Sequence, residues 1–160
     1  ATLDELTNIS NRRGFMALAQ QGINFCIRQG IPASLGFFDM NKFKEINDAH
    51  GHAEGDKALI TFAKHIKGTL RDSDIIARIG GDEFAALLIN TPKHQAEEII
   101  VRSKQLLDKY NQEEKREYEI SFSHGIVDFD AEKHQSVEEL LAEGDLLMYR
   151  NKKAEDLTKR

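Results

Sequence analysis

The chain has 160 residues, 40% hydrophobic and 31% charged, which suits one globular domain with a sizeable core. Its formal net charge of −5 argues against a nucleic-acid partner, because such binding depends on neutralisation of phosphates by Lys and Arg. Cys26 is the only cysteine, which excludes an internal disulfide and a cysteine-based zinc site.

Apolar residues at helical spacing predict helices in four parts of the chain. The first runs from about 11 to 29, and the second carries its apolar stripe over 59–70. The third begins after Thr91, which we expect to be its N-cap, with Pro92 in the first turn. The last begins at the capping box of residues 136–139.

Compact apolar runs predict strands at 34–39, 74–79, 84–90 and 118–129, and the charged stretch 111–119 is predicted to be a solvated loop. The second and third strands are close enough to form an antiparallel hairpin. Because helices and strands alternate irregularly around this hairpin, we expect an α+β fold with helices packed on a mostly antiparallel sheet.

The whole chain, residues 1–160, is predicted to be one domain. It contains no signal peptide and no apolar run of the roughly 20 residues that a membrane helix needs. It begins at Ala1 within a structural pattern and without an initiator Met. We therefore expect a domain excised from a longer protein.

The turn of the predicted hairpin reads Gly80-Gly81-Asp82-Glu83 and is the most informative segment. The glycines permit unusual backbone conformations and leave room for a ligand. If the strand that ends at Asp39 lies beside the hairpin, its carboxylate converges with those of Asp82 and Glu83. Such carboxylates suit Mg²⁺ and the phosphates that it carries. The alternative is a polar turn, with Asp39 as a helix cap.

A second polar pair follows the first predicted strand. Asn47 and Asp56 bracket a glycine-bearing loop. An amide can face a carbonyl and a ring nitrogen together, and a carboxylate accepts from an exocyclic amine and an adjacent N–H. Guanine offers both edges. The alternative is that both residues are helix caps.

Several separated motifs in this order resemble the GGDEF domain, the catalytic domain of diguanylate cyclases. The resemblance begins at Asp4-Glu5-Leu6-Thr7 and Asn11-Arg12-Arg13, and continues from Asp39 to Asp56 and through Gly80–Phe84. It ends at Asp145, Tyr149 and Lys152, so it covers essentially the whole chain.

The resemblance implies a five-stranded sheet flanked by helices, similar to the palm-like core of nucleotidyl cyclases. It also implies an enzyme that condenses two GTP into cyclic di-GMP and releases pyrophosphate, with Mg²⁺ (or Mn²⁺) as cofactor. Each protomer of a homodimer would hold one GTP, and each 3′-hydroxyl would attack the α-phosphate of the other GTP. A cytoplasmic setting follows from the substrate, although the parent protein could be membrane-anchored, and an upstream regulatory domain is expected.

The resemblance assigns roles to individual positions. The expected catalytic residues are Asp82 and Glu83, and the expected metal ligands are Asp39, the carbonyl of Met40, Asp82 and Glu83. The expected substrate-binding residues are Phe43, Asn47, His52, Asp56, Gly80, Gly81 and Lys152, with the lysine acting as a point charge at the triphosphate.

Arg71 and Asp74 form an Arg-x-x-Asp motif where the family carries its product-inhibition site, and Arg102 stands where a second arginine would complete it. Arginine can stack on guanine and donate to its acceptor edge. The alternative is a solvated pair at a helix-to-strand corner.

Two positions depart from the family pattern: the first alters the electrostatics expected at the metal, and the second removes a phosphate-binding arginine, which weakens the expectation of tight GTP binding. Asn41 replaces a frequent acid, and Glu155-Asp156 stand where many members have Gly-Arg. An active diguanylate cyclase remains the favoured hypothesis. The alternatives are a catalytically silent domain that senses cyclic di-GMP or GTP, and a GTP-binding regulatory domain of a larger phosphodiesterase.

Overall fold

The structure is a computed structural model and describes residues 1–158. The helices are α1 (Arg12–Gln29), α2 (Phe43–His50), α3 (His52–Thr69), α4 (Lys93–Glu114) and α5 (Val137–Thr158). The strands are β1 (Ala33–Met40), β2 (Ile75–Gly80), β3 (Glu83–Ile89) and β4 (Phe122–Asp128).

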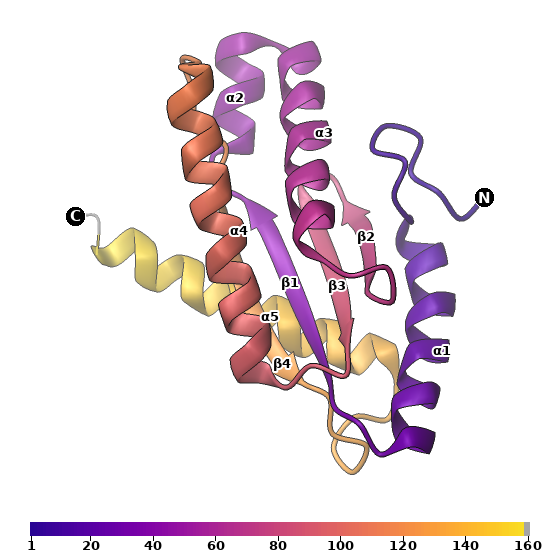
Figure 1. Cartoon of the computed structure of the whole chain (residues 1–160). Helices are drawn as coiled ribbons and strands as arrows, with labels where there is room; N and C mark the ends of the chain where they lie inside the picture. The colour runs from indigo at the N-terminus through magenta and orange to yellow at the C-terminus, as the bar shows by residue number, and fades with distance from the viewer. Residues whose placement is uncertain (159–160) are drawn as a thin grey trace.

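The strands form one antiparallel sheet in the order β2-β3-β1-β4 (Figure 1). The expected α+β class with an antiparallel sheet flanked by helices is confirmed. The expected number of five strands is wrong, because the described residues form four. The apolar runs of the sequence also supply only four, and residues 118–121, predicted to begin the last strand, precede β4.

Both faces of the sheet are covered, which explains why the central strands are largely apolar on both sides. Side chains alternate between faces along a strand. Phe38 of β1 and Phe84 of β3 therefore pack with α3 and α4, whereas Leu35 and Leu87 pack with α1 and α5. In Figure 1, α3 and α4 lie in front of the sheet and α5 crosses behind it.

Two glycines allow α5 to lie directly against the sheet. A Cβ atom at Gly125 of β4 would lie 2.5 Å from the backbone nitrogen of Met148, and one at Gly144 of α5 would lie 2.7 Å from Leu35 Cδ2. Both distances are shorter than real Cβ contacts, so only glycine permits this approach. The close packing brings the second half of α5 to the end of β1.

Several boundaries differ from the predictions because tertiary contacts override local signals. The segment after β1, expected as a loop around Gly51, contains the separate helix α2. Thr91 is not the N-cap of α4: Pro92 takes that position without a side-chain cap, and the Thr91 hydroxyl bonds to Ile89 O instead. Helix α4 extends to Glu114, into the predicted loop.

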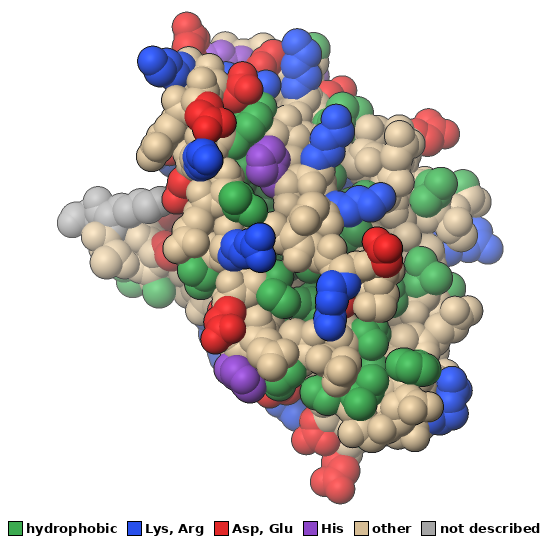
Figure 2. Space-filling view, viewed as in Figure 1, with side chains coloured by type: hydrophobic (Ala, Val, Ile, Leu, Met, Phe, Trp, Pro, Cys, Tyr) green, Lys and Arg blue, Asp and Glu red, His purple; other side chains and the backbone are tan. Residues whose placement is uncertain are grey.

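The surface over α3 and α4 carries acidic and basic side chains that are interspersed, with apolar side chains between them (Figure 2). Within residues 1–158, no helix combines the length and apolar character required to span a membrane.

Candidate functional site

The sheet brings the predicted acidic residues to one edge, at the place where β1 ends and β3 begins. Asp39 at the end of β1 lies opposite Glu83 in the antiparallel register with β3. The backbone N–H of Met40 donates to Asp82 O at 3.1 Å, which joins the end of β1 to the hairpin turn. Figure 1 shows the tip of β1 below α2 and the arrowhead of β2, which leads into the β2–β3 turn, at the same end of the sheet beside α3. The fold thus brings the backbones of Asp39, Asp82 and Glu83 together at the end of β1.

The electrostatic environment of this edge favours the binding of a cation. Burial raises the pKa of Asp82 to about 6, and a hydrogen bond with the Asp39 carboxylate and its negative charge add to the rise. Burial also raises the pKa of Glu83, together with the charges of Asp145 and Asp39. The cation Lys152 opposes the rise at both Asp82 and Glu83.

Lys152 makes the closest cationic contact of this acidic edge. Its Nζ lies 2.6 Å from Asp39 Oδ2, and both side chains are partly buried. The contact depends on α5 lying against β4 and β1. The sequence predicted Lys152 as a ligand of the triphosphate and did not predict its pairing with Asp39, because residues 113 positions apart have no local signal.

The donor set is chemically suited to Mg²⁺, which prefers oxygen ligands. Within residues 1–158, no three His, Cys, Asp or Glu side chains are grouped so as to hold a metal ion. The carboxylates of Asp39 and Asp82 would therefore need a further oxygen ligand, and the one expected from the resemblance is the carbonyl of Met40, a residue that is 1% exposed. Burial is the main cause of the rise in the pKa of Asp82, but Asp39 lies close enough for its negative charge to add to it, and a bound cation would relieve that repulsion.

Gly80 and Gly81 contribute to the site because they have no side chain to block a ligand. Neither Gly80 nor Gly81 has a positive φ, so the expectation of an unusual backbone conformation is wrong. A Cβ at Gly81 would meet open space, and one at Gly80 would approach only Glu83 Oε1, at 3.3 Å. The backbone is therefore open to a ligand, as predicted.

The predicted base-reading residues lie on α2 and α3. The Oδ1 of Asn47 is buried and has no hydrogen-bond partner in the described chain. A Cβ at Gly55 would lie 1.8 Å from this oxygen, so the glycine is required for its position. The half-buried ring of Phe43 lies next to the same position, while His52 and Asp56 are exposed. A buried acceptor of this kind can be satisfied by an N–H group of a ligand or by water.

The turn is also tied to the N-terminal segment. Arg78 donates from Nε to Gly81 O at 2.9 Å, and its Nη1 lies 3.3 Å from Asp4 Oδ1. The Oδ2 of Asp4 accepts from both the backbone N–H and the hydroxyl of Thr7. In the sequence, Asp4 and Thr7 stood out only as part of the resemblance, and no pattern singled out Arg78 as a contact of the turn. One arginine thus connects the start of the chain to the hairpin.

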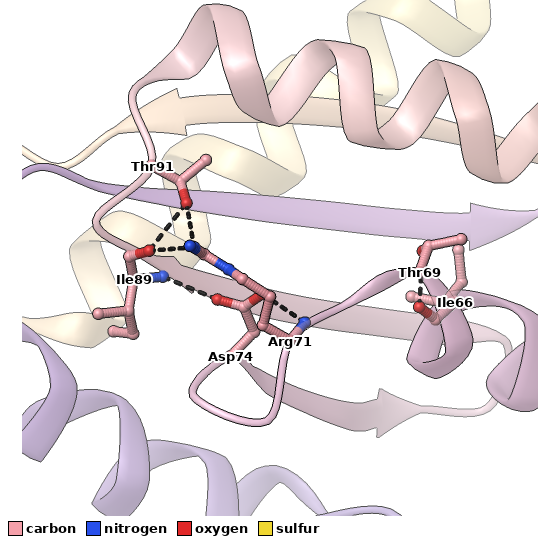
Figure 3. A network of polar contacts seen from close by, with 6 residues as sticks. All are labelled: Ile66, Thr69, Arg71, Asp74, Ile89 and Thr91. Atoms are coloured by element: carbon pink, nitrogen blue, oxygen red, sulfur yellow. Dashed lines mark hydrogen bonds and ion pairs between the residues drawn. The ribbon is translucent and has the colours of Figure 1, made fainter.

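The predicted inhibitory residues occupy the corner between α3 and β2 (Figure 3). Asp74 Oδ2 accepts from Arg71 N at 2.9 Å, and Oδ1 accepts from Ile89 N at 3.0 Å. The Asp74 side chain is 1% exposed, whereas that of Arg71 is 54% exposed. Arg71 Nη2 donates to Ile89 O and to Thr91 Oγ1. The pair is therefore part of a partly buried network rather than a solvated pair.

Arg102 is exposed on α4. Its neighbour Ser103 shares a hydrogen bond of 2.6 Å with Thr69 at the end of α3, two residues before Arg71. The two arginines therefore lie on neighbouring segments, although the structure shows no direct contact of Arg102 with Arg71 or Asp74.

Comparisons with known proteins agree with this geometry. The family described as "Diguanylate cyclase, GGDEF domain" matches residues 1–157. The chain is 32% identical over 154 residues to "Probable diguanylate cyclase DgcC" of Escherichia coli K12, which aligns 96% of this chain with 41% of that protein. The chain thus spans about two fifths of this relative.

Solved structures show the same fold. A sensory box/GGDEF family protein from Caulobacter crescentus has a TM-score of 0.85 at 27% identity, over 96% of this chain and 99% of that one. A microbial GGDEF domain, described in its interaction with cyclic di-GMP, has a TM-score of 0.82 at 30% identity, over 96% and 94% of the two chains. With a family match over nearly its whole length, the chain belongs to the GGDEF domain family of diguanylate cyclases.

Proposed function

We propose that this domain is a diguanylate cyclase that binds one GTP at the edge formed by β1 and the β2–β3 turn. The observation that carries the proposal is the adjacent pair of carboxylates, Asp39 and Asp82, of which Asp82 has its pKa raised to about 6. A negatively charged edge of this kind binds triphosphate only together with a cation. Bound Mg²⁺ would neutralise charge on the phosphates and lower the pKa of a nearby hydroxyl.

Different residues of the chain would bind the guanine base and the triphosphate of GTP. Asn47 and Asp56 would read guanine, since an amide can face a carbonyl and a ring nitrogen together and a carboxylate can accept from the N–H groups of the base. Phe43 and His52 would line this half of the site. Lys152 would leave Asp39 and donate to the triphosphate when the cation arrives.

The reaction would require a homodimer with one GTP in each protomer. Each 3′-oxygen forms a bond to the α-phosphorus of the other GTP, and the bond from that phosphorus to pyrophosphate breaks. Asp82 would take the hydroxyl proton, because its carboxylate would lie beside the cation and within reach of the attacking hydroxyl. Glu83 would add negative charge at the cation site. Most of the rate would come from positioning and charge stabilisation.

Cyclic di-GMP would also act as an inhibitor, bound through Arg71 and Arg102. About half of the Arg71 side chain is exposed, whereas both carboxylate oxygens of Asp74 accept hydrogen bonds from backbone N–H groups. We therefore infer that the arginines contact the product and that Asp74 stabilises the backbone conformation of the corner between α3 and β2. A cytoplasmic setting, an upstream regulatory domain and dimerisation through it complete the proposal.

Production of cyclic di-GMP from GTP and Mg²⁺ by the purified domain tests the activity. Asp82→Asn should abolish product formation, and Glu98→Gln, on the exposed surface of α4, is the matched control. Equal activity of wild type and Asp82→Asn would refute the assigned role.

The alternative is a silent domain that senses cyclic di-GMP or GTP, favoured by the acids at Glu155 and Asp156 in place of a phosphate-binding arginine. Binding of cyclic di-GMP without turnover, including in a dimer enforced by a fused coiled coil, would support this alternative.

A further inference from the structure

Two side chains on one face of α5 contact two directly paired residues of the sheet. Lys152 and Glu155 are three residues apart and therefore lie on the same side of the helix. Lys152 Nζ lies 2.6 Å from Asp39 Oδ2, and Glu155 Oε2 lies 2.9 Å from Ser123 Oγ. Asp39 and Ser123 are partners in the register of β1 and β4. The last turns of α5 are thus attached at two adjacent points.

The buried hydroxyl of Ser123 has two neighbouring oxygens but only one proton. Ser123 is fully buried, and its Oγ lies 2.9 Å from Asn41 Oδ1 as well as 2.9 Å from Glu155 Oε2. It cannot donate to both. Asn41 Nδ2 is also 3.1 Å from Ser121 Oγ.

Rotation of the Asn41 amide by half a turn resolves this conflict, and the two amide orientations are not distinguished by heavy-atom positions. Asn41 Nδ2 then donates to Ser123, Ser121 donates to Asn41 Oδ1, and Ser123 donates to Glu155. Each of these four side chains then has a partner. The arrangement requires a donor at position 41, which an aspartate would not supply.

We propose that Glu155 is a positioning residue that holds Lys152 at the end of β1 through the buried hydroxyl of Ser123, and that the neutral amide of Asn41 is what permits a carboxylate at position 155. The two departures from the family pattern are then a matched pair rather than independent losses. The role of Glu155 in positioning Lys152 rests on the proposed function. The pairing of Asn41 with Glu155 is independent of that function.

The positive charge of Lys104, on α4, stabilises the carboxylate of Glu155. Burial lowers the pKa of Lys104, and the charges of Glu155 and Glu97 oppose that decrease. Lys104 therefore lies near enough to Glu155 to interact with it, and it comes from α4, whereas Ser123 lies in β4 and Asn41 follows β1. A negative charge on Glu155 is thus compensated although it faces a buried hydroxyl.

Thermal unfolding of four variants in EDTA at pH 7.5 tests the pairing. Asn41→Asp places two carboxylates on one hydroxyl and should lower Tm by at least about 5 °C. Glu155→Gln should lower Tm by less than about 2 °C, because the amide can also accept from Ser123. The double variant should recover most of the loss, since the new amide on α5 donates to Ser123 and the Ser123 hydroxyl donates to the new carboxylate after β1. Asp156→Asn, which removes an exposed carboxylate one residue further on, is the control.

Recovery in the double variant would support the pairing, and an Asn41→Asp loss that Glu155→Gln fails to reverse would overturn it. For the role towards Lys152, Glu155→Ala should raise the KM for GTP roughly three- to ten-fold with little change in kcat, while Glu155→Gln remains near wild type. Unchanged KM in Glu155→Ala would overturn that role. If the wild type binds no GTP by calorimetry with Mg²⁺, the positioning role fails with the proposed function, and the unfolding experiment still decides the pairing.

Discussion

Replacement of Asp74 by alanine should destabilise the domain far more than its place in a surface corner suggests. The carboxylate is 1% exposed and accepts from the backbone N–H groups of Arg71 and Ile89. A hydrogen bond to a charged group contributes about 1.5–3 kcal/mol. In Asp74→Ala the exposed Arg71 N–H is rehydrated, but the N–H of Ile89, a residue only 8% exposed, loses its partner. We expect a loss of about 2–4 kcal/mol.

For a domain of this size, that loss corresponds to a decrease in Tm of roughly 5–12 °C. Circular dichroism during heating and during urea unfolding measures it. Arg71→Ala is the matched comparison, since its side chain is 54% exposed and its loss should lower the stability by only about 1 kcal/mol. A decrease in Tm of less than about 2 °C for Asp74→Ala would refute the reasoning. Arg71→Ala is therefore also the cleaner test of product inhibition, which Asp74→Ala would confound with unfolding.

Three further predictions concern the rest of the site. Gly55→Ala should weaken GTP binding at least about ten-fold by calorimetry, because the new methyl group displaces Asn47; unchanged affinity would remove Asn47 from the site. Gly125→Ala should lower the free energy of unfolding by about 1–3 kcal/mol, measured in urea, because α5 must move away from β4, and an unchanged midpoint would contradict the close packing. Burial acts to raise the pKa of Asp4, but hydrogen bonds from Thr7 and the charge of Arg78 outweigh it and lower the pKa. The stabilisation by Asp4 should thus be complete above its ordinary pKa of about 4 and decline as pH falls through the lowered value. The difference in Tm between wild type and Asp4→Asn should accordingly shrink in acid, and a constant difference would contradict this assignment.

The strands and most helices could be predicted because their signals are local. The compact apolar run of β1 indicated a central strand, and the structure covers it on both faces. The short glycine-rich turn between two apolar runs indicated the β2–β3 hairpin, which the register confirms. Helix α2 was missed, because eight residues with one buried position, Ile46, have too few apolar residues for a periodic pattern. Thr91 was assigned as a cap from its residue type, whereas its hydroxyl bonds to Arg71 and Ile89 in the fold.

For the candidate site, the sequence by itself determined which chemical groups are present: the carboxylates of Asp39 and Asp82, the amide of Asn47 and the ammonium of Lys152. These follow from residue type and from short motifs. Only the tertiary structure decided that Lys152 lies against Asp39 and that Glu155 shares a buried hydroxyl with Asn41. Such contacts join α5 to strands that are far away in the chain. They depend on how closely two glycines let that helix approach the sheet, which no local pattern encodes.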